Sequence, residues 1–209
     1  MRLLSSNIFI TLFYLLSNSC SAAFIFINEI HYDNAGTDQN EFIEVTGKAG
    51  IDLSDWSLVL YNGSNGEVYD TITLSGRLTD QSNGFGFAAF FNTGIQNGIK
   101  DGIALVYQNV VEQFISYEGT LMGSNGVAAG LISEDIGISE SSATPLGYSL
   151  QLTGTGLQYS DFTWQSLEAS AGQINSQQQI NNQQSIPEPN SSILLLSVLV
   201  LLSLSKKNC

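Results

Sequence analysis

The stretch VYDTITL, residues 68–74, alternates between two sets of side chains with a period of two. That period is typical of a β-strand with one face buried and one face in water. Turn signals stand on both sides of it, since Asn62-Gly63 and Asn65-Gly66 precede the stretch and Asn83-Gly84 follows it. Asn and Gly tolerate the positive φ that tight turns between strands require. The stretch therefore predicts a half-buried strand bounded by turns.

Short segments of the same kind, rich in β-branched and aromatic residues, recur along the rest of the chain. No stretch between the two chain ends shows the 3.6-residue apolar stripe of an amphipathic helix. Eight short strands at this spacing predict an all-β fold, a β-sandwich, in which residues 119–144 form a long loop. The seven further segments are 24–32, 41–46, 56–61, 85–91, 103–107, 110–117 and 148–152.

The charge balance excludes some classes of partner. The chain has 209 residues, with 6 Lys and Arg against 19 Asp and Glu, and a formal net charge of −13. Between residues 24 and 186 the only basic residues are Lys48, Arg77 and Lys100. Contacts to phosphates need clustered Lys and Arg, so direct binding to nucleic acid is not expected, and neither is adhesion to anionic lipid. Such acidity keeps a secreted protein soluble and weakly attracts divalent cations.

Several spaced motifs resemble the lamin-tail domain in its bacterial form. Residues 27–30 read INEI, residues 41–45 read EFIEV and residues 52–58 read DLSDWSL. Residues 101–106 (DGIALV) and 147–151 (GYSLQ) also stand where that family places strands. The resemblance runs from residue 25 to residue 164. It implies an immunoglobulin-like β-sandwich without catalytic machinery of its own.

The same motifs have a direct physical interpretation. Phe42, Val45 and Trp56 are large apolar residues suited to the inner faces of two packed sheets. Carboxylates in these apolar strands are unusual, and we expect them to point outward or to accept backbone hydrogen bonds at sheet edges. These carboxylates belong to Glu29, Glu41 and Glu44.

The loop at residues 31–41, HYDNAGTDQNE, is the best candidate site. Asp33, Asp38 and Glu41 are candidate oxygen ligands for Ca²⁺, with Asn34 or backbone carbonyls completing the shell. Ala35 occupies a ligand position of the EF-hand pattern, so the loop is not an EF-hand. The alternative is a polar hairpin loop held by Asx turns. We expect no required cofactor, and Ca²⁺ is the one candidate ion.

The residues that carry catalysis are scarce. His31 is the single histidine, and no Gly-x-Ser-x-Gly motif occurs. A Ser-His-Asp triad would need His31, and two-metal hydrolysis needs several histidine and aspartate ligands. Carboxylates are plentiful, so the inventory alone leaves a glycosidase open. We expect His31 to be a surface residue at a strand end, and exposed aromatics such as Tyr61 and Tyr69 to be candidates for a glycan-binding face.

The C-terminal end has three parts. Pro187, Glu188 and Pro189 precede residues 193–204, of which ten of twelve are Leu, Ile or Val, and Lys206 and Lys207 follow. A helix over 190–205 would be roughly 24 Å long at 1.5 Å per residue. A bilayer core of about 30 Å is usually crossed by about 20 apolar residues. We predict a short transmembrane helix at 191–205, with the two lysines at the cytoplasmic face.

This tripartite end resembles a PEP-CTERM sorting signal. In Gram-negative bacteria such signals are recognised by a membrane cysteine protease of the exosortase class. The resemblance implies that the tail anchors the chain temporarily and is cut near residues 187–189. The body would then be released or passed to the envelope surface.

The N-terminal end has the layout of a secretory signal peptide. Met1-Arg2 carries a positive charge, residues 8–16 are apolar and residues 17–23 are small or polar. Cleavage is expected after Ala22 or Ala23. The two cysteines, Cys20 and Cys209, lie in the two removed segments. The mature body would therefore depend on a packed core without disulfides.

The expected organisation has four parts: a signal peptide at 1–23, the sandwich at 24–169, a Gln/Asn-rich linker at 170–186 and the sorting signal at 187–209. The linker has few apolar residues and is expected to be a disordered spacer. We expect an exported, non-enzymatic interaction module, anchored at the inner membrane and then placed at the cell surface or outside the cell. Its ligand would be extracellular polysaccharide or a surface protein. The alternatives are a secreted metal-dependent hydrolase, nuclease-like or phosphoesterase-like, and a structural matrix component.

Overall fold

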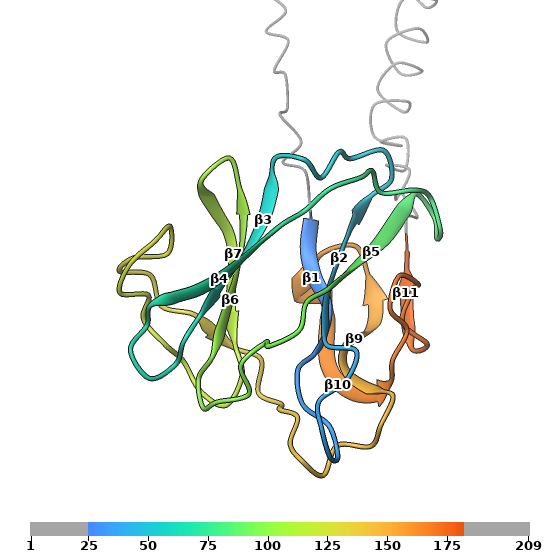
Figure 1. Ribbon diagram of the computed structural model, residues 1–209. Helices are drawn as coiled ribbons and strands as arrows, with labels where there is room; N and C mark the ends of the chain where they lie inside the picture. Colours follow the sequence, from blue (N-terminus) through green and yellow to red (C-terminus); the bar gives the residue numbers. More distant parts are fainter. Residues whose placement is uncertain (1–24, 182–209) are drawn as a thin grey trace, which may run out of the picture.

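The computed structural model describes residues 25–181, which fold into two β-sheets packed against each other (Figure 1). The first sheet has the strand order β10-β9-β1-β2-β5, with β11 paired to β9, and the second has the order β4-β3-β6-β7-β8. The all-β, two-sheet architecture predicted from the strand pattern is confirmed.

Most pairs of neighbouring strands are antiparallel, and the two exceptions, β11 with β9 and β8 with β7, are parallel. The first sheet consists of β1 (Ile25–His31), β2 (Phe42–Lys48), β5 (Phe85–Phe91), β9 (Tyr148–Gly156), β10 (Phe162–Glu168) and β11 (Gln178–Ile180). The second sheet consists of β3 (Trp56–Tyr61), β4 (Val68–Thr73), β6 (Gly102–Tyr107), β7 (Val110–Ser116) and β8 (Glu134–Asp135). A short 3₁₀ helix, Tyr159–Asp161, precedes β10.

All eight expected strands are present, and three further strands, β8, β10 and β11, were not predicted. Within residues 25–181 no helix is long and apolar enough to cross a membrane. The expected signal peptide at 1–23 and the expected transmembrane helix at 191–205 lie outside the described residues.

The main core lies between the two sheets. Val45 and Trp56 belong to it, as the sequence predicts. Phe42 does not, because its neighbour Ile43 occupies the inner face and successive strand residues point to opposite sides. Full burial of one such aliphatic side chain contributes about 1.5–3 kcal/mol. The inner residues include Ile27, Ile43, Leu150, Leu58, Leu60, Ile103, Leu105 and Ile115.

An irregularity in β1 decides what lies on the other face of the first sheet. Ile27 pairs with Val45, but the next pair is Glu29 with Glu44, so that Asn28 is the extra residue of a β-bulge. The bulge shifts the alternation by one residue, and Ile30 returns to the core. Two polar residues in succession are thereby placed on the face that points away from the core.

Residues 170–181, which we call the strap, cover this polar face. The prediction of a disordered linker is wrong for these residues: Asn175 and Gln178 are buried, and β11 pairs with β9. The physical reason is that the covered surface is itself polar, so amide side chains bind it by hydrogen bonds where an apolar segment could not. Residues 182–186 of the expected linker lie outside the described part of the chain.

Candidate functional site

A cleft of about 530 Å³ opens where β1, β2 and β5 meet the turn at residues 146–148 and the start of the strap. Phe42 and His31, which are direct partners across β1 and β2, contribute to its wall. Phe91 at the end of β5 lies beside Phe42, with ring centroids 5.5 Å apart. The cleft therefore depends on three strands of one sheet and on a loop and a strap from distant parts of the sequence.

The rim of the cleft exposes large apolar side chains to water. Phe91 is 65% exposed and Leu146 is 62% exposed, and Tyr148 between the turn and β9 is half-buried. The side-chain amides of Gln39, Asn40 and Gln173 are also exposed around it. Aromatic surface beside exposed side-chain amides is a combination that binds ligands with both apolar and hydroxyl groups.

His31 is the one cleft residue that can carry a charge, although the protein is strongly acidic. The thirteen residues that line the cleft include no Asp, Glu, Lys or Arg. His31 is the one lining residue that titrates near neutral pH. The field inside the cleft thus favours an uncharged, polar ligand, while the net charge of −13 repels anions from the molecule as a whole.

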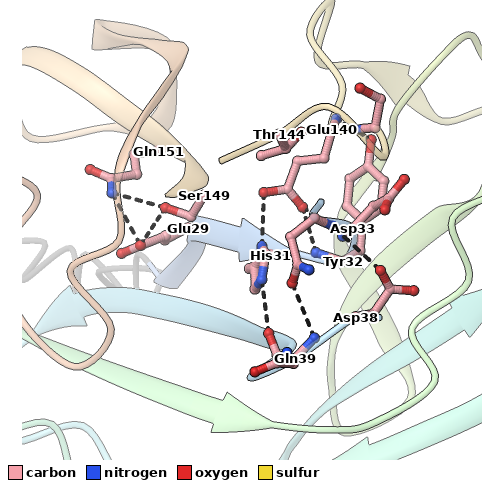
Figure 2. A network of polar contacts seen from close by, with 12 residues as sticks. Glu29, His31, Tyr32, Asp33, Asp38, Gln39, Glu140, Thr144, Ser149 and Gln151 are labelled. Carbon is pink, nitrogen blue, oxygen red and sulfur yellow. Dashed lines mark hydrogen bonds and ion pairs between the residues drawn. The ribbon is translucent and has the colours of Figure 1, made fainter. Parts of the chain in front are cut away.

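His31 is buried, which corrects the expectation of a surface histidine, because only 4% of the residue is exposed. Figure 2 shows its ring between two acceptors. Its Nδ1 lies 2.9 Å from a carboxylate oxygen of Glu140, and its Nε2 lies 3.0 Å from the backbone carbonyl oxygen of Gln39. Both ring nitrogens donate to these acceptors only in the doubly protonated form.

The balance of forces on His31 favours that form. Burial lowers the pKa of His31. The hydrogen bond and negative charge of Glu140, together with the Gln39 carbonyl, raise this pKa by more than burial lowers it, so the net direction is upward. A ring held in this way clamps the loop to the strand, and neither nitrogen is free to act as a general base.

Glu140 ties the long loop to the end of β1. Its second carboxylate oxygen accepts the backbone N–H groups of Tyr32 at 2.6 Å and Asp33 at 2.9 Å. Its own backbone N–H donates to the Tyr32 hydroxyl at 2.7 Å, and the Tyr32 ring stacks on Tyr117 with centroids 3.9 Å apart. Sequence reasoning missed Glu140, because one acidic residue among small residues carries no local signal.

The structure does not gather the three candidate Ca²⁺ ligands. Asp33 and Asp38 are near neighbours: burial raises the pKa of Asp33, and the charge of Asp38 raises it further. Glu41 is committed elsewhere, since one of its oxygens accepts the backbone N–H groups of Gly94 at 2.8 Å and Ile95 at 2.6 Å. No group of three or more His, Cys, Asp or Glu side chains placed to hold a metal ion occurs in the part of the chain that the structure describes.

The alternative interpretation of this loop, a polar hairpin loop held by its own side chains, agrees with the contacts of Asn34. Its Oδ1 accepts the backbone N–H of Gln39 at 3.1 Å, and its amide nitrogen donates to the carbonyls of Ala35 and Thr37. Asn34 is 1% exposed. The loop thus forms one wall of the cleft and is held by the hydrogen bonds of Asn34.

Two of the three unusual carboxylates form a buried pair beneath the strap. Glu29 and Glu44 are direct cross-strand partners, and both are 0% exposed. Of the two expected alternatives, exposure to water is wrong for both residues, whereas both do accept backbone hydrogen bonds. Burial raises the pKa of each, and the charge of Glu29 raises that of Glu44 further.

Glu29 is held from β9 and from the strap. One oxygen accepts the Ser149 hydroxyl at 2.6 Å, the Gln151 amide at 3.2 Å and the Ser170 backbone N–H at 2.8 Å. Figure 2 shows the part of this network formed with Ser149 and Gln151. The other oxygen lies 2.9 Å from the Ser170 hydroxyl.

Glu44 meets a donor at each of its oxygens. The Asn28 amide donates to one at 2.8 Å, and the backbone N–H of Gly172 donates to the other at 2.6 Å. The Gln178 amide in turn donates to Asn28 at 2.7 Å. The strap is therefore fastened to both members of the pair.

The two tyrosines proposed for a glycan-binding face do not form one. Tyr61 is 0% exposed, and its hydroxyl accepts the backbone N–H of Ala128 at 2.9 Å. Tyr69 is half-buried, and its hydroxyl accepts the backbone N–H of Gln96 at 3.0 Å. The aromatic surface at the cleft comes instead from Phe42, Phe91 and Tyr148.

Comparison with protein-family models, curated proteins and solved structures finds no match to this chain. The cleft and the buried carboxylate pair are therefore interpreted from their own geometry. The expected cleavage residues Ala22 and Ala23 and the sorting-signal residues Pro187, Glu188, Pro189, Lys206 and Lys207 lie outside the described residues.

Proposed function

We propose that this protein is an exported, non-enzymatic binding module that holds a neutral segment of an extracellular polysaccharide in the cleft at Phe42, Phe91 and Tyr148. The cleft itself is the observation that carries this proposal. Its volume of about 530 Å³ lies in the range of ligand sites, roughly 300–1,000 Å³.

The chemistry of the lining supports a saccharide as the ligand. A sugar ring presents apolar C–H groups to an aromatic face such as that of Phe91, and its hydroxyls pair with amides such as those of Asn40 and Gln173. The lack of charged lining residues, other than a protonated His31 already paired with Glu140, favours a neutral sugar over a uronic acid or a sulfated sugar.

The route to the cell surface is part of the same proposal. Residues 8–16 and 17–23 support export by a signal peptide, and residues 187–209 support sorting through a PEP-CTERM signal and an exosortase-type protease. The INEI, EFIEV and DLSDWSL motifs support assignment of the two-sheet body to immunoglobulin-like lamin-tail domains.

A secreted metal-dependent hydrolase has less support. Such an enzyme would need a free histidine or a cluster of carboxylates, whereas both ring nitrogens of His31 are engaged and Glu41 is bound to backbone N–H groups. Turnover of a nucleic acid or phosphoester by the purified protein, lost in His31→Ala, would replace the proposal by this alternative.

A saccharide array tests the proposed function. We expect the purified protein to bind neutral oligosaccharides saturably and to bind anionic ones at least about tenfold more weakly, a difference of about 1.4 kcal/mol. Phe91→Ala should abolish binding. The matched control is Val110→Ala, which removes a 59% exposed apolar side chain on β7 in the other sheet and should change nothing. Binding that survives Phe91→Ala, or binding to proteins alone, contradicts the proposal.

A further inference from the structure

The strap is closed over two carboxyl groups that have no cation beside them. Glu29 and Glu44 contact Ser149 and Gln151 of β9, Asn28 of β1, and Ser170 and Gly172 of the strap, none of which carries a charge. The ion pairs within residues 25–181 are His31 with Glu140 and Arg77 with Asp52, and neither involves this pair. Two full negative charges on adjacent buried residues would be strongly unfavourable without a counter-ion.

The hydrogen bonds indicate where one proton resides. Both oxygens of Glu44 face N–H donors, which suits a carboxylate. The Ser170 hydroxyl has one proton, yet its oxygen lies 2.9 Å from Glu29 and 2.9 Å from the side-chain carbonyl of Asn175. If Glu29 is protonated, its O–H donates to Ser170 and the Ser170 hydroxyl donates to Asn175, so one proton serves each of these two hydrogen bonds.

We propose that the strap, residues 170–181, is a proton-controlled closure: it is docked while the Glu29–Glu44 pair holds one proton, and it is released when that proton is lost. Release breaks the contacts of Ser170 and Gly172 with the pair and frees β11 from β9. The raised pKa of both carboxyl groups agrees with a pair that keeps a proton above the usual range of glutamate.

Closure also completes the cleft, because Ser170, Ala171 and Gln173 of the strap are part of its lining. This consequence rests on the proposed function: saccharide affinity should fall as the strap opens. The strap itself is measured without saccharide, so an open strap at high pH with no binding at any pH would count against the proposed function alone.

Hydrogen–deuterium exchange of the strap peptide between pH 5 and pH 9 tests the closure, with protection factors corrected for intrinsic exchange. In the unmodified protein we expect protection of residues 170–181 to fall by up to about tenfold per pH unit between the ordinary glutamate value of 4.5 and the raised pKa of the closed pair, and to level off above it, because opening releases one proton in that interval. Strand β6, buried in the other sheet, should keep its protection.

Two substitutions separate the roles of the two carboxyl groups. Glu29→Gln imitates the protonated acid, since its amide can donate to Ser170 while its oxygen accepts from Ser149 and Gln151; the strap should stay closed at every pH. In Glu44→Gln the new side-chain NH₂ faces the N–H donor of either Asn28 or Gly172, so one hydrogen bond is lost. The strap should therefore be undocked at every pH. Glu112→Gln on the exposed side of β7 is the control and should follow the unmodified protein.

Strap protection that does not change with pH in the unmodified protein overturns the proposal. So does a pH response that persists in Glu29→Gln. If that variant does not fold, the carboxyl carbon resonances of ¹³C-labelled glutamates give the answer: a Glu29 signal that titrates together with strap opening supports the closure, and opening without such a titration contradicts it.

Discussion

Glu29 and Glu44 stand opposite each other on β1 and β2, fully buried, and in the described part of the chain neither contacts a basic side chain. A β-bulge at Asn28 places Glu29 on the face away from the hydrophobic core, where the alternation of β2 places Glu44, and the strap covers both. This relationship links β1 and β2 to a segment more than a hundred residues later, because Ser170 donates to Glu29 and Gly172 donates to Glu44, which is 128 residues away.

The stability of the folded protein should decrease as the pH rises above the ordinary glutamate value of 4.5. Both folded-state pKa values are raised, so the folded state binds more protons than the unfolded chain, and this stabilisation is lost as the pH passes through the folded values. Urea unfolding at pH 4.5 to 9 measures the slope. Glu29→Gln should flatten it, and a slope that is unchanged in this variant would contradict the assignment.

The pKa of His31 depends on Glu140, and removal of the carboxylate should reverse its direction. In Glu140→Gln the charge that raises the pKa is gone and burial, which lowers it, remains, so His31 should titrate below its ordinary value of 6.5. The loss of a buried pair also costs about 3 kcal/mol. A pH titration of the His31 ring by NMR checks the direction, and Glu134→Gln on exposed β8 is the control.

The clamp at His31 has its own pH window. Because the folded pKa is raised, its stabilising contribution is complete below about 6.5 and is lost as the pH rises through the folded value. His31→Gln should remove this part of the pH dependence while leaving the part due to Glu29 and Glu44 in place. Equal curves for the variant and the unmodified protein above pH 6.5 would show that the clamp adds nothing.

The strap is part of the folded body, and its removal should destabilise the protein. A chain ending at residue 169 removes the Gly172 N–H from Glu44, the Gln178 amide from Asn28, and Ile180 from its apolar neighbours. We expect a loss of about 3 kcal/mol or more relative to a chain ending at residue 181. Equal unfolding midpoints for the two chains would mean that residues 170–181 act only as a spacer.

Export and sorting predict the ends of the mature protein. The intact mass of the protein recovered from its host should correspond to a polypeptide that begins after Ala22 or Ala23 and ends near Pro187. A mass that includes Cys209 would indicate a protein that keeps its C-terminal anchor.

The strand pattern was sufficient for the all-β, two-sheet class and for eight of the eleven strands, because alternation and turn residues act locally. Trp56–Tyr61 and Phe85–Phe91 match their predicted bounds, and Val45 lies in the core as expected. The strand at residues 178–180 was not predicted, because a short polar strand becomes stable only against the polar surface beneath it. A composition rich in Gln and Asn, taken alone, is typical of disorder.

The cleft could not be predicted for a similar reason. Phe91 and Leu146 come from separate elements and meet only through the register of β2 with β5 and the path of the turn before β9. The bulge at Asn28 places His31 on the face away from the core, and the buried partner of His31, Glu140, is 109 residues away. Neither relationship leaves a mark in the local sequence.

Saccharide binding at the cleft is tested most directly by NMR titration of the ¹⁵N-labelled protein with a neutral oligosaccharide. We expect saturable shifts of backbone amides around the cleft, at Asn40, Phe91, Gly147, Tyr148 and Ala171, and unshifted resonances in β6 and β7. Shifts gathered on the second sheet, or no shifts with any neutral saccharide, would contradict it.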